Sequence, residues 1–210
     1  MKQHVGVVRR SLRLGLCIIY VFSFTALAAA NDIPAGQQGD DAVNPLIQRM
    51  IGDWDVRQRM WPGAQAKALD LPPAVAHRVL IGPVILQETM ALKSGSSEAP
   101  FTRLAYFDFN IVTHRFEYFS LDTRAPQMMS ERSLTAGAGS NSHLSAPLTL
   151  YGGRFIAPQW GESKNVPFRY RIAIGDVDKE QQTVRLYFTP QSAADAREFL
   201  AFEYVYTRKR

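Results

Sequence analysis

Cysteine is almost absent from this chain, since the only one among 210 residues is Cys17. The chain after it can therefore form no internal disulfide, and it has no thiolate for a zinc or iron-sulfur site or for nucleophilic catalysis. Lipidation of Cys17 is not expected, because a lipid-bearing cysteine follows a small residue and Leu16 stands there. Stability must therefore come from packing of the core.

Long hydrophobic runs are also lacking, apart from Leu14–Leu27. That run is too short for a comfortable membrane span of about 20 residues. It follows a basic start and precedes the small-residue site Ala28–Ala30, an order that predicts a secretory signal peptide over residues 1–30. We expect a periplasmic or secreted protein, with a retained anchor as the alternative. Arg9–Arg10 leaves the twin-arginine route open beside the general secretory one.

A charge excess is lacking once the leader is set aside. The whole chain has 24 Lys and Arg against 19 Asp and Glu, and the leader holds four of the basic residues and none of the acidic ones. The remaining 20 basic residues leave the mature chain nearly neutral. Arg208–Arg210 is the only basic run there, so we expect no nucleic-acid partner and no stable membrane insertion.

Signatures of catalysis and of cofactor binding are missing as well. The chain has no Gly-x-Ser-x-Gly or His-Glu-x-x-His motif, and the glycines of segment 136–141 match no phosphate-binding fingerprint. Beyond the leader the histidines are His77, His114 and His143, and no two of them have metal-ligand spacing. The sequence therefore predicts neither a metal nor a cofactor.

A two-residue alternation is what the sequence does contain, and it is first clear in Gly52–Trp61. Trp54, Val56 and Met60 share one side, whereas the charged residues of the segment occupy the other. A helix would spread these charges around its circumference, so the pattern favours a strand with one dry face and one wet face. Before it, Asn44–Pro45 and an apolar stripe predict one short helix that ends at Gly52.

Similar segments recur at hairpin spacing along the rest of the chain. A surface loop is expected at Leu71–Pro73, and Tyr151–Val166 is expected to be irregular because it contains Gly152, Gly153 and Pro158. The further predicted strands are Ala74–Ile81, Val84–Leu92, Thr102–Phe109, Arg115–Leu121, Gln127–Leu134, His143–Leu150, Phe168–Ile174, Thr183–Phe188 and Arg197–Thr207.

About ten strands and one helix over residues 44–210 predict a single all-β domain, preceded by a flexible linker over residues 31–43. Short turns without crossover helices favour an antiparallel up-and-down barrel, whose closure leaves no exposed edge.

Several short motifs carry a resemblance to a known family. They are Gly52-Asp53-Trp54 after a short helix, Tyr106-x-Asp108 before a turn that ends in Arg115-Phe116, the step Leu121-Asp122, and the closing segment Glu203–Arg208. In this order they resemble a family of uncharacterised secreted bacterial proteins with calycin-type, lipocalin-like or nitrobindin-like barrels. The resemblance covers nearly the whole mature chain.

In lipocalin-like barrels the tryptophan of the first strand closes one end of the lumen, and an arginine near the last strand covers its ring. The resemblance therefore implies a structural pair of Trp54 and Arg208, stacked by a cation-π contact. The alternative is an ordinary core tryptophan and a frayed terminal arginine. Nitrobindin-type barrels hold haem through a late histidine, and no histidine follows His143 here, so haem is not expected.

The direction of Trp54 sets the expected lining of the lumen. If Trp54 points inward, strand parity gives an aromatic interior with several hydroxyl groups, and a barrel of this size is either filled by side chains or holds one small ligand. Buried tyrosines need a water, a polar neighbour or a ligand as partner. The expected lumen residues are Val56, Met60, Tyr118, Phe168, Tyr170, Ile172, Leu186, Phe188, Tyr204 and Tyr206.

Glu88 is the charged residue of most interest, because it lies between Leu86 and Met90 on the expected inward side of its strand. An ionised carboxylate there needs an arginine or tyrosine partner, or else its pKa rises. It could orient a ligand or act as a general acid or base, and a structural ion pair or a place at the rim is the alternative. Asp122 precedes a turn and is interpreted as a turn residue.

Three hypotheses for function remain open. The first is a barrel that binds a small, largely apolar molecule in its lumen. The second is a cofactor-free enzyme of the isomerase or cyclase type, in which Glu88 and a lumen tyrosine transfer protons. The third is a filled barrel with a structural or interaction role. The sequence does not determine the ligand or the oligomeric state.

Overall fold

The structure is a computed structural model, which describes residues 44–82, 84–95, 100–133, 147–175, 177–191 and 196–210. It opens with the helix α1 (Pro45–Met50), for which Asn44 is the N-cap and accepts a hydrogen bond from the Leu46 amide at 2.9 Å. The helix ends before Gly52, whose φ of +126° suits glycine. The expected signal peptide and linker lie outside the described residues.

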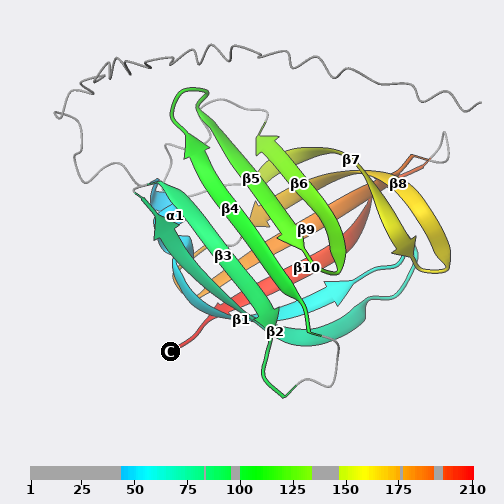
Figure 1. The fold of residues 1–210 in the computed structure, drawn as a ribbon, viewed down its shortest axis with the longest axis horizontal. Helices are drawn as coiled ribbons and strands as arrows, with labels where there is room; N and C mark the ends of the chain where they lie inside the picture. The colour runs from blue at the N-terminus through cyan, green and yellow to red at the C-terminus, as the bar shows by residue number, and fades with distance from the viewer. Residues whose placement is uncertain (1–43, 83, 96–99, 134–146, 176, 192–195) are drawn as a thin grey trace, which may run out of the picture. The chain divides into compact units, whose positions relative to one another are not determined.

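In the described part of the chain ten antiparallel strands form a closed barrel, as predicted, with each strand beside its sequence neighbour and β1 beside β10. Figure 1 shows β3, β4 and β5 side by side, with α1 next to the start of β1. The strands are β1 (Gly52–Met60), β2 (Leu69–Ile81), β3 (Ile85–Leu92), β4 (Thr102–Asn110), β5 (Arg115–Asp122), β6 (Ala125–Ser133), β7 (Leu148–Trp160), β8 (Ser163–Gly175), β9 (Gln181–Pro190) and β10 (Phe199–Arg208).

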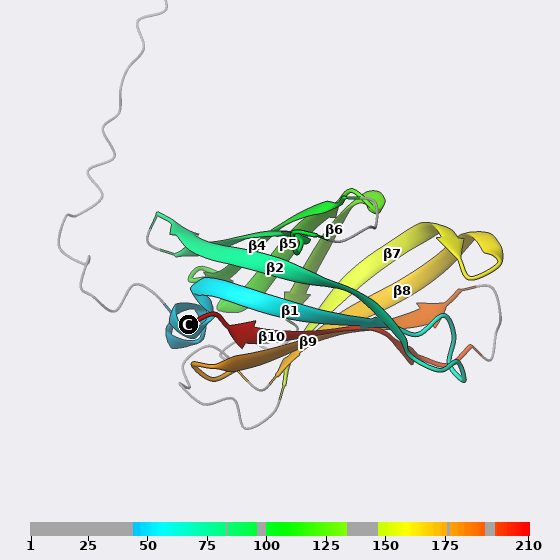
Figure 2. The same ribbon diagram turned by 90° about the horizontal axis from the view of Figure 1, so that it is seen from below.

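Within the described residues, the seam between β6 and β7 has fewer paired residues than any other seam of the ring. Only three residue pairs join the two strands in the described part of the chain, from Glu131–Gly152 to Ser133–Leu150. By contrast, β7 pairs with β8 along nearly its whole length, from Leu148 to Trp160. Among the described residues, the first half of β6 and the second half of β7 therefore show no strand pairing with each other, and Figure 2 shows the two strands diverging there.

The expectation of an irregular segment at Tyr151–Val166 is wrong. The segment forms the second part of β7, a tight turn and the start of β8. Gly152 and Gly153 lie at a register shift against β8, so the glycines produce a local irregularity and the strand continues beyond it. Pro158 lies in the stretch that has no β6 partner, where the missing amide hydrogen leaves no ladder bond unmade.

The loop predicted at Leu71–Pro73 also belongs to a strand, because β2 begins at Leu69. Gln58 pairs with Leu71 and Val56 with Ala74, so Pro72 and Pro73 together lie opposite Arg57. This bulge accommodates two residues that cannot donate to the ladder.

Burial alternates along the strands and divides the residues between the inside and the outside of the barrel. Arg103, Ala105 and Phe107 on β4 are buried, whereas Leu104 and Tyr106 between them are partly exposed. At the end where β1 begins, the buried side of α1 joins the interior through residues such as Met50. No helix in the described ranges has the length and apolar composition needed to cross a membrane.

Candidate functional site

An ion-paired cluster lies inside the barrel and is built from three neighbouring strands. Glu88 on β3 pairs in register with Arg78 on β2 and with Ala105 on β4, which brings Arg103 within reach. Arg78 Nε donates to Glu88 Oε2 at 2.6 Å, and Arg103 Nη1 donates to Oε1 at 3.1 Å. All three side chains are nearly inaccessible to solvent. One carboxylate thus bridges two buried guanidinium groups.

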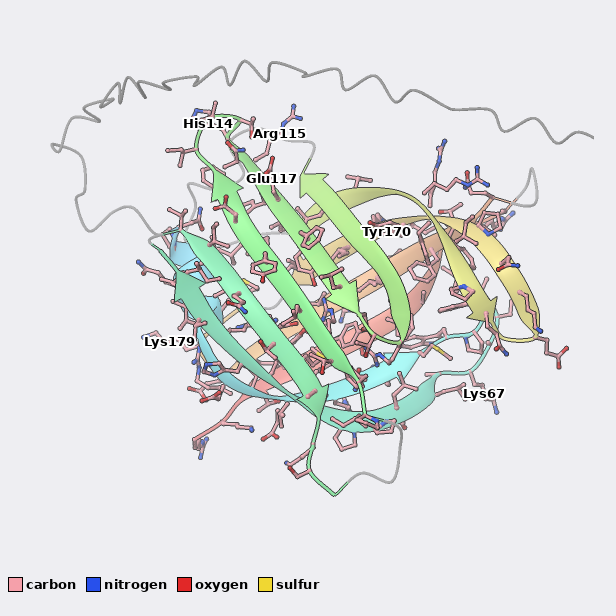
Figure 3. The ribbon with its side chains drawn as sticks, in the orientation of Figure 1. Lys67, His114, Arg115, Glu117, Tyr170 and Lys179 are labelled. Carbon is pink, nitrogen blue, oxygen red and sulfur yellow. The ribbon has the colours of Figure 1, made fainter. Side chains whose placement is uncertain are left out.

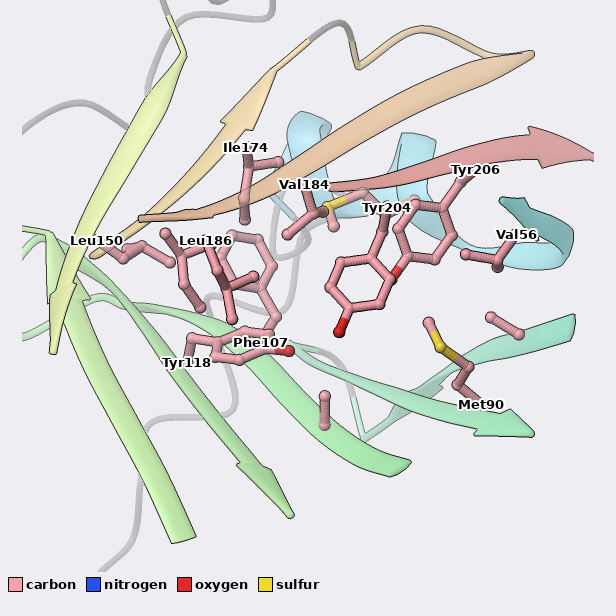
Figure 4. Close-up of a cluster of buried hydrophobic side chains, with 14 of the residues drawn as sticks. Val56, Met90, Phe107, Tyr118, Leu150, Ile174, Val184, Leu186, Tyr204 and Tyr206 are labelled. Atoms are coloured by element: carbon pink, nitrogen blue, oxygen red, sulfur yellow. The ribbon is translucent and has the colours of Figure 1, made fainter. Parts of the chain in front are cut away.

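Tyrosines and a glutamine complete this cluster from the other strands. Arg103 donates to the Tyr118 hydroxyl on β5, and Arg78 donates to Oε1 of Gln182 on β9. The Arg78 guanidinium lies 4.0 Å from the ring centroid of Tyr206, and the Tyr206 hydroxyl is 3.5 Å from Glu88 Oε1. Figure 4 shows Tyr118, Tyr204 and Tyr206 reaching the same interior region from strands of opposite walls.

The ion pairs determine the protonation of the cluster. Burial alone would raise the pKa of Glu88, but the positive charges of Arg78 and Arg103 outweigh it and hold that pKa below its ordinary value. Burial and the nearby Glu88 charge raise the pKa of Tyr206 to about 12. At neutral pH the cluster therefore contains an ionised carboxylate, two guanidinium ions and a neutral phenol.

A cavity of about 20 Å³ adjoins the cluster. Its wall includes Glu88, Arg103 and Tyr206 on the polar side, and Met50 and Phe107 on the apolar side. A cavity of this volume has room for roughly one water molecule, because a single water needs a cavity of about 10–15 Å³ on the same measure. In the present conformation, side chains therefore fill the lumen around the Glu88 cluster.

Trp54 has two arginines near its ring at the α1 end, with Arg208 in close contact and Arg78 farther away, 5.8 Å from the ring centroid. Its ring is fully buried, its Nε1 donates to the Met50 carbonyl at 3.0 Å, and the Arg208 guanidinium lies 4.2 Å from its centroid. Arg208 also donates to the carbonyl oxygens of Ile51 and Arg49. The arginine thus joins the last strand to the end of α1 across the indole face, in the arrangement that the family resemblance implies.

The other end of the lumen is aromatic and is formed by β7 to β10. Phe155 lies 5.6 Å from Phe168 and 4.9 Å from Phe188 between ring centroids, and Trp160 lies 5.1 Å from Phe188. Nε1 of Trp160 is buried without a hydrogen-bond partner among the described residues. Phe155 and Trp160 belong to the half of β7 that has no β6 neighbour. This aromatic group therefore includes two side chains from the part of β7 that has no β6 neighbour.

Arg124 links several elements at the end of the barrel remote from α1. It lies in the β5–β6 turn, where Asp122 accepts from its Nη2 at 2.6 Å and Phe101 places its ring centroid 3.7 Å from the guanidinium. Its Nη1 also donates to Gln58 Oε1 on β1 at 3.2 Å. Asp122 accepts from the Arg124 amide as well, so it has the turn role expected of it.

Most residues expected in the lumen are buried, but Met60 is not, because it lies half-exposed at the last position of β1. Tyr106 faces outward and packs near Phe119, so it is not a neighbour of Glu88 in the lumen. Figure 3 shows Tyr170 on the same side of the view as β7 and β8. The remaining expected residues are buried: Trp54, Val56, Glu88, Tyr118, Phe168, Tyr170, Ile172, Leu186, Phe188, Tyr204 and Tyr206.

The sequence reasoning missed both arginine partners of Glu88. Arg78 follows Ala74 and Ala76 at two-residue intervals, and Arg103 precedes Ala105 and Phe107 in the same way. If the two-residue alternation of each strand is continued by one more interval, both guanidinium groups are predicted to lie inside the barrel. A charge at the end of an alternating apolar series was the available signal.

The geometry of this cluster suits the orientation of a ligand better than the transfer of a proton. Glu88 is enclosed, and its lowered pKa makes it a poor general acid and a weak base at neutral pH. Within the described ranges, no group of three or more His, Cys, Asp or Glu side chains is arranged to hold a metal ion.

No family model and no curated protein matches this chain. The class of protein is therefore defined by its architecture, an antiparallel up-and-down barrel consistent with a calycin-like fold.

Proposed function

We propose that the barrel is a secreted or periplasmic binding protein for one small, largely apolar molecule with a polar group, as a member of the calycin-like family that its motifs resemble. The observation that carries the proposal is the incomplete β6–β7 seam. Where the described parts of β6 and β7 share no ladder hydrogen bonds, the two strands can separate further at low cost, and Phe155 of the aromatic group lies on this part of β7.

The lumen offers different chemistry at its two ends. The apolar part of a ligand would replace contacts among the rings of β7 to β10, and its polar group would reach Tyr204 or the hydroxyls beside Arg103. The buried Trp160 N–H is a further donor on this path. Small-molecule sites commonly combine apolar walls with a few polar groups that fix orientation.

The cavity of about 20 Å³ sets a condition on binding. A ligand of modest size needs several times that volume, so the aromatic side chains and the β7–β8 hairpin must move apart to admit it. If a ligand buried about 300 Å² of apolar surface, transfer would contribute about 7 kcal/mol, and association would cost at least about 4 kcal/mol. The difference of about 3 kcal/mol corresponds to roughly millimolar affinity before any hydrogen bond is counted. Hydrogen bonds to the polar group of the ligand strengthen binding towards the micromolar range, and the cost of opening weakens it.

Titration with the neutral apolar dye N-phenyl-1-naphthylamine tests the proposal. We expect saturable binding at one site, and Tyr204→Arg should abolish it because Tyr204 is buried in the lumen. The matched control is Val205→Arg, one residue further on the outward side of β10, which should bind dye as the wild type does. Circular dichroism establishes that both variants are folded.

A second variant keeps the test decisive if Tyr204→Arg does not fold. Tyr204→Ala removes a ring from the lumen and should strengthen dye binding, because less side-chain displacement is needed. Absence of binding by both the wild type and Tyr204→Ala would reject lumen binding. That result would favour a filled barrel that acts through its outer surface, a second candidate that the small cavity supports.

A further inference from the structure

The Glu88 cluster contains more positive than negative charge. Among the side chains that the structure describes, the buried charged groups that line the lumen are Arg78, Glu88 and Arg103. Tyr206 supplies no negative charge at neutral pH, because burial and the Glu88 charge raise its pKa to about 12. The described part of the lumen therefore has one guanidinium charge in excess of its carboxylate charge.

A second group of one glutamate and two arginines lies on the outer side of the barrel and provides a comparison. There Glu203 bonds Arg59 and, at 2.9 Å, Arg185. Both of these arginine side chains are partly exposed, so water solvates the charge that Glu203 does not balance. The lumen cluster is nearly inaccessible to solvent, and an unbalanced charge in such surroundings is strongly unfavourable.

The two buried arginines share the Glu88 carboxylate unequally. Arg78 places both Nε and Nη2 at 2.6 Å from Glu88 Oε2. Arg103 has a longer contact of 3.1 Å from Nη1 to Oε1, and its Nη2 donates to the Tyr118 hydroxyl. The excess charge is therefore centred on Arg103. The cavity of about 20 Å³ is lined by Arg103 and Tyr118 together, so it adjoins this charge.

Aromatic rings connect Arg103 with the aromatic group of β7 to β10. The Arg103 guanidinium lies 5.2 Å from the ring centroid of Tyr204. The Tyr204 ring lies 6.2 Å from that of Phe202, which in turn lies 5.5 Å from Trp160. Figure 4 shows the hydroxyl groups of Tyr118 and Tyr204 directed into the same interior region. A positive charge at the end of a series of rings favours a ligand with an apolar body and one anionic end.

We propose that Arg103 binds the carboxylate of an apolar carboxylic acid, whose body lies along the rings from Tyr204 to Trp160. The proposal rests on the lumen binding proposed above and names the class of ligand. A carboxylate carries one negative charge, which balances the excess, whereas an alcohol leaves the excess and a phosphate monoester exceeds it. One carboxylate oxygen is about as large as a water molecule, for which the cavity beside Arg103 has room.

Competition between the bound dye N-phenyl-1-naphthylamine and two ligands of equal chain length tests the proposal. The ligands are decanoate and decan-1-ol, which share an apolar chain and differ in the charge of the head group at neutral pH. Decanoate should displace the dye from the purified protein at a concentration at least about tenfold lower than decan-1-ol. This ratio is measured within each variant, so a change in dye affinity does not alter it.

Substitutions at Arg103 separate its charge from its packing. Arg103→Met removes the excess charge and should abolish the preference for decanoate, whereas Arg103→Lys keeps the charge and should retain most of it. Arg59→Met is the matched control, because Arg59 also bonds a glutamate but lies on the outer side of the barrel, and it should keep the full preference. If Arg103→Met does not fold, Tyr118→Phe removes one hydroxyl beside Arg103 and should lower the preference.

Three results overturn the proposal while lumen binding stands, provided that the dye binds the wild type. The first is equal displacement by decanoate and decan-1-ol, with a preference for decanoate that emerges only in Glu131→Gln. Glu131 is in register with Tyr118, and that result would assign the balancing charge to the chain itself. The second is a tyrosinate absorbance at neutral pH that disappears in Tyr118→Phe, which would assign the charge to that phenol. The third is equal displacement together with a melting temperature that rises in sodium chloride but not in sodium gluconate, which would assign the cluster to a free inorganic anion.

Absence of dye binding is a different outcome. It rejects the proposed lumen binding, and the assignment of a carboxylic acid with it. The two failures are therefore distinguishable, since only the second leaves decanoate with no dye to displace.

Discussion

Replacing Glu88 by glutamine should destabilise the barrel far more than the same change at Glu203. Each glutamate is bonded to two arginines, but Glu88 and its partners are enclosed in the lumen, whereas Arg59 and Arg185 around Glu203 are each 34% exposed. Glu88→Gln leaves two buried guanidinium groups without a counter-charge, which costs about 3–5 kcal/mol. Glu203→Gln should cost about 1 kcal/mol or less, since its arginines remain hydrated.

Urea unfolding followed by tryptophan fluorescence measures both free energies, because Trp54 is fully buried in the folded state. The pH dependence supplies an independent check. The pKa of Glu88 is lowered from 4.5 in the folded state, so its stabilising contribution is complete above about pH 4.5 and disappears as the pH falls through the folded value. The difference between wild type and Glu88→Gln should therefore shrink below about pH 4.5.

Replacing the whole cluster distinguishes lost ion pairing from lost packing. A triple variant with Arg78→Met, Glu88→Leu and Arg103→Met has no buried charge among these positions, so it should regain most of the stability that Glu88→Gln loses. The reasoning is refuted if Glu88→Gln costs no more than Glu203→Gln at pH 7. It is refuted equally if the deficit of Glu88→Gln stays the same from pH 7 to pH 3.5, as approximate limits.

Two further predictions concern packing. An added Cβ at Gly152 would overlap the Tyr170 ring, so Gly152→Ala should lower the free energy of unfolding by about 1–3 kcal/mol. Gly153 has open space around the position of an added Cβ, so the free energy of unfolding of Gly153→Ala should stay within about 0.5 kcal/mol of the wild-type value. Equal effects in urea unfolding would contradict this packing. Arg208→Met should cost about 0.5–2 kcal/mol through the lost cation-π contact, measured by thermal unfolding against the exposed Arg210→Met. If both arginine variants melt alike, Arg208 does not secure the end of the barrel.

The local sequence pattern predicted the β architecture and the direction of the strand side chains. Alternation in Gly52–Trp61 placed Trp54 and Val56 inside, and the same parity placed Glu88 inside between Leu86 and Met90. These inferences succeed because the side-chain direction in a strand repeats every two residues, which a short stretch of sequence displays. The short helix was predictable for a similar reason, since Asn44 caps it through a local hydrogen bond.

Glycine and proline misled the same reasoning where pairing mattered. Pro72 and Pro73 indicated a loop, but they lie in a bulge of β2 opposite Arg57. Pro158 and the glycines of β7 indicated irregular structure, but the missing β6 partner and the register shift accommodate them within a strand. The strand propensity of a residue is a property of that residue alone. Whether a proline or glycine is tolerated within a sheet depends on which neighbouring strand is present at that position.

Only the tertiary structure determined which groups meet in the lumen. Sequence parity places Arg78, Glu88 and Arg103 on inner faces, but strand register alone makes the carboxylate the bridge between the two guanidinium groups. The same holds for the β6–β7 seam, where the strands pair over three described residue pairs and then diverge. Alternation is a local property of the backbone, whereas register and closure arise from contacts between residues far apart in the chain, which only the packed barrel specifies.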